Sequence, residues 1–149
     1  MKVQKSALVL YSADLMYELV NRVDAYPEFL PWCGGAQVFE ESEDSMVAEI
    51  VIDFKGVRQS FKTANELIRP IDSTPGIIKL HLVDGPFKSL SGEWRFYGLG
   101  DLGSRVEFDL HYEFSSVVLS KLLSPVFDRI AETFVDSFVA RAEAVAVHE

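Results

Sequence analysis

The chain has 149 residues, a formal net charge of −9, and a composition that is 48% hydrophobic and 25% charged. These values are typical of a globular domain and argue against a disordered chain, which would have far less Leu, Ile, Val and Phe. Phosphates repel an acidic surface, so the charge also argues against DNA and general nucleic-acid binding. The single cysteine, Cys33, excludes an internal disulfide and a cysteine-based zinc site, and it suits a reducing compartment.

No targeting or membrane-spanning segment is expected. Residues 1–11 lack the apolar run of a signal peptide. No stretch approaches the roughly 18 consecutive apolar residues of a membrane span. We therefore expect a cytoplasmic protein with at most transient membrane contact. Because no linker, repeat or low-complexity run interrupts the chain, residues 1–149 are expected to form a single domain.

The N-terminal part predicts one strand followed by two short helices. Val3–Tyr11 has the pattern of the strand. Ser12 is a suitable N-cap, and apolar residues at helical spacing then predict a helix over Ala13–Val23. A second short helix is expected over Asp24–Leu30, between the interruptions around Pro27 and Pro31.

From Ala36 to Phe114 the hydrophobic period is two, which predicts six strands with one apolar and one polar face. The apolar face is predicted to carry Met46, Ala48, Ile50, Ile52, Phe54, Val57, Phe61, Leu67, Ile78, Leu80, Leu82, Leu90, Trp94, Phe96, Val106, Phe108, Leu110, Tyr112 and Phe114. Short links such as Lys55-Gly56 and Asp84-Gly85 are typical of hairpins, so the sheet should be antiparallel.

The last part of the chain predicts one long helix. Ser124 is a suitable N-cap, and Pro125 suits the first helical position, where its missing N–H costs nothing. An apolar stripe follows, so the helix is expected over Pro125–Val147, about 34 Å at the usual rise per residue. Val117–Leu123 is expected to form a preceding turn, bent at Pro125. The fold class is therefore α+β: a seven-stranded curved antiparallel sheet around a long C-terminal helix, with room for a ligand between them.

Two motifs resemble one known family. Residues 26–33 (YPEFLPWC) closely resemble the YPxFLPxC signature of the coenzyme Q-binding START-like family, whose bacterial branch is also described as the ribosome association toxin family. Residues 82–88 (LVDGPFK), with Leu90, Gly92 and Trp94 after them, are similar to a second stretch of that family. The fourth strand is similar as well, although Ala64 stands where the family usually shows an arginine nearby.

The resemblance implies a helix-grip fold with a hydrophobic pocket for ubiquinone or another polyprenyl lipid, in support of respiratory-chain quinone function. It implies no other cofactor. The motifs do not choose between this activity and the alternative, which is binding to the large ribosomal subunit and blocking subunit association. The acidic charge argues against strong contact with rRNA but leaves a basic ribosomal protein open. A third alternative is a small cyclase- or hydratase-like enzyme.

No catalytic residue and no metal ligand is expected. Cys33 would need a base within reach to act as a nucleophile, whereas His81 and His111 fall on the polar parity of their strands and His148 lies in the tail. A small buried side chain is the simpler interpretation of Cys33. The acidic run around Glu43 has the pattern of a solvated hairpin end.

Polar and aromatic residues of the inner face are the candidates for ligand binding. Gln59, Thr63 and Asn65 should point inward, where backbone or water could satisfy them, or a quinone carbonyl could. Trp32 could gate the mouth of a pocket or simply pack. The predicted ligand-binding residues, which are equally consistent with plain core, are Phe29, Leu30, Trp32, Phe54, Phe61, Thr63, Asn65, Leu80, Trp94, Phe96, Phe108, Leu110, Phe127, Ile130 and Phe134.

Overall fold

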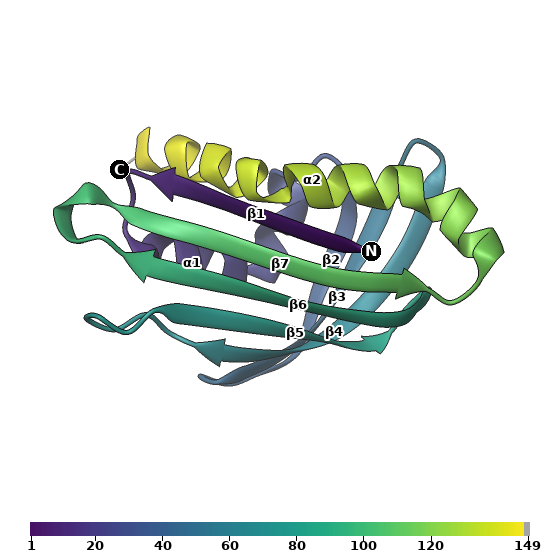
Figure 1. Ribbon diagram of the computed structural model, residues 1–149, viewed down its shortest axis with the longest axis horizontal. Helices are drawn as coiled ribbons and strands as arrows, with labels where there is room; N and C mark the ends of the chain where they lie inside the picture. Colours follow the sequence, from purple (N-terminus) through teal and green to yellow (C-terminus); the bar gives the residue numbers. More distant parts are fainter. Residues whose placement is uncertain (148–149) are drawn as a thin grey trace.

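One antiparallel sheet and one long helix dominate the computed structural model, which describes residues 1–147 (Figure 1). The elements are β1 (Lys2–Val9), α1 (Ala13–Asn21), the 3₁₀ helix η1 (Val23–Glu28), β2 (Cys33–Glu41), β3 (Ser45–Phe54), β4 (Val57–Ile68), β5 (Gly76–Asp84), β6 (Phe87–Gly98), the 3₁₀ helix η2 (Gly100–Leu102), β7 (Ser104–Phe114) and α2 (Val117–Val147). The predicted fold class and element order are confirmed.

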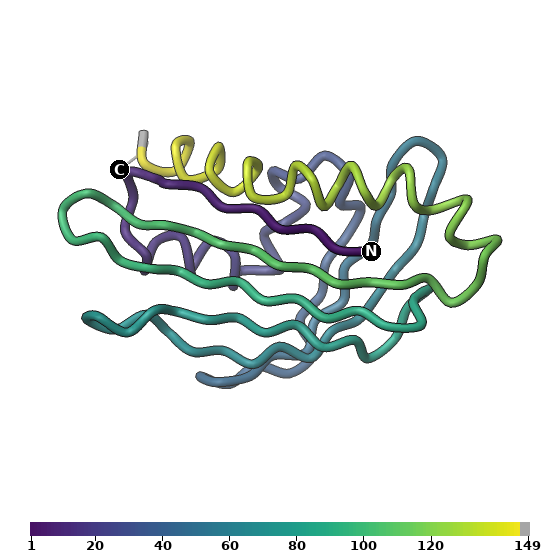
Figure 2. Tube along the Cα trace, in the orientation of Figure 1, coloured from purple at the N-terminus to yellow at the C-terminus, as the bar shows by residue number. Residues whose placement is uncertain are grey.

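The seven strands follow the order β1-β7-β6-β5-β4-β3-β2. Every neighbouring pair is antiparallel, and all pairs except β1 with β7 are joined by a hairpin connection, as the chain trace in Figure 2 shows. The β3–β4 hairpin turns through Lys55 and Gly56, both with positive φ (51° and 80°), the backbone that a two-residue turn between twisted strands requires.

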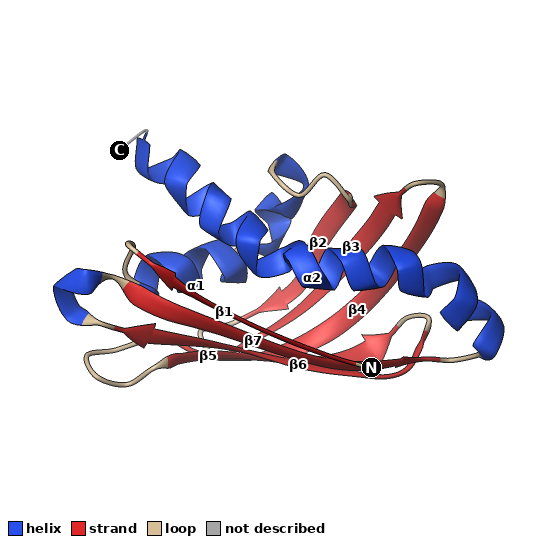
Figure 3. Ribbon diagram, turned by 45° about the horizontal axis from the view of Figure 1, so that its top comes forward, coloured by secondary structure: helices blue, strands red, loops and turns tan. Residues whose placement is uncertain are grey.

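The sheet is strongly curved, so that β2, β3 and β4 rise out of the plane of the other strands (Figure 3). Register shifts interrupt the pairing of β2 with β3 at two places, of β4 with β5 once and of β6 with β7 once. Such bulges add an extra residue on one strand and bend it. They make the concave inner face along which α2 lies.

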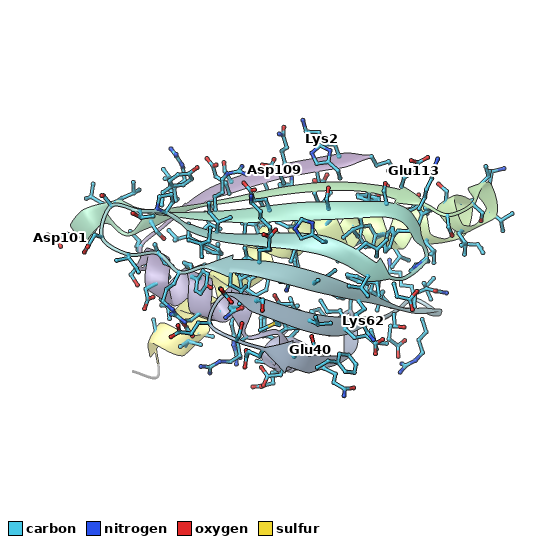
Figure 4. All side chains as sticks on the ribbon, turned by 90° about the horizontal axis from the view of Figure 1, so that it is seen from below. Lys2, Glu40, Lys62, Asp101, Asp109 and Glu113 are labelled. Atoms are coloured by element: carbon cyan, nitrogen blue, oxygen red, sulfur yellow. The ribbon has the colours of Figure 1, made fainter. Side chains whose placement is uncertain are left out.

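The two faces of the sheet differ as the alternation predicts. Along β7 the residues from Val106 to Phe114 on the apolar parity are buried. On the outer face Arg95 binds three carboxylates, with Glu93 at 2.7 Å, Glu107 at 3.0 Å, and Asp109. Figure 4 views this outer face, where charged side chains such as Asp109 project from the strands. α2 packs on the apolar face, where Phe134 contacts Trp94 and Phe108. This confirms the prediction that the sheet curves around the long C-terminal helix with its apolar face inward.

α2 begins eight residues before the predicted start at Pro125, so the prediction of Ser124 as the N-cap is wrong. Ser116 caps the helix instead: its Oγ accepts a hydrogen bond from the N–H of Leu119 at 3.1 Å. Pro125 therefore lies inside the helix. Pro125 and Lys121 are both exposed, so water can satisfy the Lys121 carbonyl that the proline leaves unpaired.

Other boundaries move by a few residues. β1 ends at Val9 rather than Tyr11, and β2 begins at Cys33, before the predicted Ala36. The first helix ends at Asn21, and the second is a 3₁₀ helix over Val23–Glu28. Within residues 1–147, no helix is both long enough and apolar enough to cross a membrane.

Candidate functional site

A small apolar cavity of about 70 Å³ lies between the inner face of the sheet and α2. Its walls come from α1, η1, the segment before β2, strands β3 to β7, and α2. The lining residues are Val20, Asn21, Val23, Tyr26, Trp32, Ala48, Ile50, Ile52, Phe61, Thr63, Asn65, Ile78, Leu80, Leu90, Trp94, Phe108, Leu110, Phe127, Ile130, Ala131 and Phe134.

Most of the predicted ligand-binding residues lie in this wall. They are Trp32, Phe61, Thr63, Asn65, Leu80, Trp94, Phe108, Leu110, Phe127, Ile130 and Phe134. The strand residues among them come together because they share the inward parity, and the α2 residues because they form the stripe that faces the sheet. Their placement is a structural result, whereas their role in binding stays a prediction.

Four predicted residues lie outside the cavity wall. Phe96 is fully buried between Tyr17 and Trp94, with ring centroids at 5.7 and 6.0 Å. Leu30 is core, and Phe29 packs against Phe138 at 5.3 Å under α2.

The fourth of these residues is Phe54, which is partly buried at the end of β3, with the Lys55 ammonium 5.4 Å from its ring. Phe54 and Phe96 have the inward parity of β3 and β6, whereas Phe29 and Leu30 belong to the segment between η1 and β2, and none of the four lines the cavity. Alternation gives the face of a residue and not its position along the cavity.

The sequence interpretation missed ten residues of the wall: Val20, Asn21, Val23, Tyr26, Ala48, Ile50, Ile52, Ile78, Leu90 and Ala131. The inward parity of the strand residues among them, such as Ala48, could have identified them. The α1 and η1 residues carry no such signal, because only the tertiary structure places these short helices against the open side of the sheet.

Phe134 joins the two layers of the aromatic wall. From α2 its ring reaches Trp94 and Phe108 on the sheet, at centroid distances of 5.5 and 5.6 Å, and Trp32 at 5.8 Å. These tilted and edge-on arrangements are the favoured geometries of aromatic pairs. Phe134 is partly exposed, unlike its neighbour Phe138, which is 1% exposed.

The polar atoms of the cavity are few. Thr63 and Asn65, both 5% exposed, form a pair in which Thr63 Oγ1 donates to Asn65 Oδ1 at 2.8 Å. Trp32 Nε1 and Asn21 Oδ1 are buried and have no hydrogen-bond partner within residues 1–147. Gln59 points inward as predicted, but it borders a separate, much smaller space.

Burial favours the neutral forms of Cys33 and Tyr26, and the histidine His81 lies away from the cavity. Burial raises the pKa of the Cys33 thiol, whose Sγ donates to the Gly35 carbonyl at 3.3 Å. Burial also raises the pKa of Tyr26, whose hydroxyl donates to the Val20 carbonyl at 2.5 Å. His81 Nε2 lies 2.6 Å from Glu66 Oε2 on the outer face. His148 lies outside the described residues.

A curved antiparallel sheet that grips a long C-terminal helix around an apolar cavity defines a helix-grip, START-like protein. The chain belongs to the polyketide cyclase / dehydrase and lipid transport family, whose model matches residues 9–139. The family resemblance that the motifs indicated is thereby confirmed.

Two similar proteins carry different kinds of name, ribosome association toxin and coenzyme Q-binding protein. The chain is 42% identical over 145 residues to a ribosome association toxin, RatA, of Vibrio cholerae, covering 97% of this chain and 96% of that protein. It is 27% identical to the mitochondrial coenzyme Q-binding protein COQ10 of Drosophila melanogaster, covering 91% of this chain and 55% of that protein.

Solved structures agree with the fold. The 18 kDa protein CC1736 from Caulobacter crescentus is 33% identical, with a TM-score of 0.72 and 98% of each chain covered. The Zhui aromatase/cyclase from Streptomyces sp. R1128 has a TM-score of 0.79 over 96% of this chain and 93% of its own. At 18% identity, that likeness shows the fold alone.

Proposed function

We propose that the chain binds an apolar ligand with a polar head in the cavity between the sheet and α2, without catalysis. The observation that carries this proposal is a largely apolar space between the sheet and α2 whose wall includes few polar residues. Ubiquinone or a similar polyprenyl lipid is the proposed ligand, which would connect the protein with respiratory quinone function. The motif resemblance and the name of the COQ10 relative support this ligand.

The size of the cavity sets a condition on binding. About 70 Å³ is far below the roughly 300–1,000 Å³ of sites that hold drug-sized ligands. A quinone ring therefore has to displace wall residues. Phe61 and Phe134 are the candidates to move, because they are only partly buried, whereas Trp94 is fully buried.

Binding without catalysis fits the chemistry of the wall. Its polar side chains are those of Asn21, Tyr26, Trp32, Thr63 and Asn65. Amide, indole and alcohol groups do not titrate near neutral pH, and burial raises the pKa of Tyr26 further above it. Such a wall supplies hydrogen bonds to a ligand and no acid–base pair.

A matched pair of alanine substitutions tests the proposal. Ala48, in the cavity wall, and Ala142, on the buried face of α2 and outside that wall, are both almost completely buried. Ala48→Leu should fill the space, abolish binding of a short-chain ubiquinone and change the melting temperature little. Ala142→Leu should overpack the core and cost about 1–3 kcal/mol of stability, while binding persists at temperatures where the protein is folded. Unchanged ubiquinone binding in folded Ala48→Leu would contradict the proposal.

Ribosome association is a second candidate, favoured by the name of relatives that match the chain over nearly its whole length. Such association would place the protein in the cytoplasm. With a net charge of −9, we expect contact through a basic ribosomal protein rather than rRNA. The test is co-sedimentation with isolated large subunits over a range of salt. Salt screens contact with rRNA and contact with a basic protein alike, so binding that falls steeply with salt would indicate an electrostatic contact of either kind. No binding at any salt would reject this candidate.

A further inference from the structure

The two unpaired polar atoms in the wall are chemically complementary. Trp32 is 6% exposed, and its indole Nε1–H is a donor only. Asn21 Oδ1 is an acceptor only. This oxygen is buried, although Asn21 as a whole residue is partly exposed. Both residues line the cavity. Two residues of the cavity wall therefore carry one unused buried donor and one unused buried acceptor.

Such atoms are expensive when they stay unpaired. A buried donor or acceptor without a partner costs the folded state about 1–3 kcal/mol. In native proteins, most buried side-chain polar atoms have a hydrogen-bond partner. The Thr63–Asn65 pair in the same cavity is satisfied in this way. The unpaired state of Trp32 and Asn21 therefore points to an occupant that pairs with them.

Asn21 also marks the polar side of the cavity. It is the last residue of α1, and it borders both the cavity and an external groove lined by charged side chains such as Glu18 and Arg22. Trp32 precedes β2, close to η1 in the chain. A ligand with its polar head near Asn21 would keep its apolar part against the aromatic wall.

We propose that the cavity recognises a hydroxyl group, so that it prefers a quinol over the corresponding quinone. A hydroxyl oxygen can accept from the Trp32 indole while its proton is donated to Asn21 Oδ1. A quinone carbonyl can only accept, and it would leave the Asn21 oxygen buried and unpaired. This inference rests on the proposed ligand-binding function and adds the redox form that the site selects.

Ordered water is the alternative occupant, because the cavity is large enough to hold it. Water that remained in place would satisfy Trp32 and Asn21 whichever ligand entered. The site would then show no preference between ligands that differ only in a hydroxyl group.

The experiment compares three probes of the same ring and tail under anaerobic conditions: a short-chain ubiquinol, the matching ubiquinone and the quinol dimethyl ether. We expect the wild-type protein to bind the quinol at least about tenfold more tightly than either of the others. The dimethyl ether keeps the aromatic ring of the quinol but has no hydroxyl to donate.

Two substitutions separate the roles of the two atoms. Asn21→Leu removes the acceptor, so it should weaken quinol binding and bring the quinol-to-quinone ratio close to one. Trp32→Phe removes a donor that both forms can use, so it should weaken both and keep the ratio. Leucine is a better helix former than asparagine, and Asn21→Ala provides a second fold-compatible variant.

Equal binding of quinol and quinone by the wild-type protein would overturn the hydroxyl preference and leave the ligand-binding function standing. A preference that survives in Asn21→Leu and Asn21→Ala would also overturn it, because the acceptor would then lie elsewhere. If none of the three probes binds, both the preference and the quinone ligand are wrong.

Discussion

Phe134 and Phe138 stand four residues apart on α2 and differ in what surrounds them. Phe138 is almost completely buried and contacts Tyr26, Phe29 and Trp94, whereas Phe134 borders the cavity and is partly exposed. We expect Phe138→Ala to cost about 3–5 kcal/mol in urea unfolding, the usual value for a packed core aromatic. Phe134→Ala should cost clearly less, because that ring is already partly exposed and borders the cavity, so its removal gives up less buried apolar area.

The same pair of variants should also differ in binding. Phe134→Ala enlarges the cavity, so short-chain ubiquinone should bind at least as well as it does to the wild-type protein. Equal stability costs for the two variants, together with weakened binding in Phe134→Ala, would mean that the wall around Phe134 is ordinary core.

Cys33 is assigned a packing role only. Its thiol is buried, its pKa is raised by that burial, and its hydrogen bond goes to the backbone of Gly35. A serine hydroxyl can donate to the same carbonyl. We therefore expect the ubiquinone affinity of Cys33→Ser, measured by titration with a short-chain ubiquinone, to stay within about threefold of the wild-type value. A tenfold change would correspond to about 1.4 kcal/mol of binding free energy. A folded Cys33→Ser protein that has lost its function would contradict this role.

At the scale of single residues, the sequence predicts the face of a side chain better than its partners. The parity of β4 places Thr63 and Asn65 inward correctly, but it cannot show that the two side chains bind each other. Trp32 was open to either a gating or a packing role, because the segment around Pro27 and Pro31, which it follows, has no periodic pattern. Asn21 was missed, because its importance depends on where α1 meets the sheet.

Among the elements, α2 departs most from what the sequence predicts. A Ser-Pro pair favours a helix start, and here the proline is instead tolerated on the exposed side of a helix capped by Ser116. Pro125→Ala should therefore stabilise the protein by about 1 kcal/mol or more in urea unfolding, because an interior proline costs a helix up to about 3 kcal/mol. A helix that truly began at Pro125 would gain nothing from this change.

The capping assignment has its own test. Ser116→Ala should cost about 1 kcal/mol, since it removes the side-chain acceptor for the Leu119 N–H. Ser124→Ala is the matched control and should be close to neutral. If Ser124→Ala instead lowered the stability in urea unfolding more than Ser116→Ala, the result would support a helix that begins at Pro125.

The strands follow the sequence more closely than the helices do. From β3 to β7 a period of two, interrupted by short links rich in glycine or proline, predicts each strand, its inner face and the antiparallel order. The bulges in β2, β5 and β6 are not visible in that period, because a bulge depends on how two strands pair. The curvature of the sheet, and with it the volume of the cavity, therefore needed the structure.

In the molecule as a whole, the two faces of the sheet serve different purposes. The outer face is charged and carries the ion pairs of Arg95, while the inner face, α1, η1 and α2 enclose the apolar space (Figures 3 and 4). Both the ligand proposal and the ribosome proposal can be accommodated, because one uses the interior and the other a surface. The structure shows a cavity in the interior, and the ligand proposal rests on it.

The most direct test of this interior site is mass spectrometry of lipid extracted from the purified native protein, with Ala48→Leu purified in parallel. We predict that a polyprenyl lipid with an oxygenated ring co-purifies with the wild-type protein and is absent from the folded Ala48→Leu variant. Equal recovery of lipid from both proteins, or none from the wild type, would contradict a ligand site between the sheet and α2.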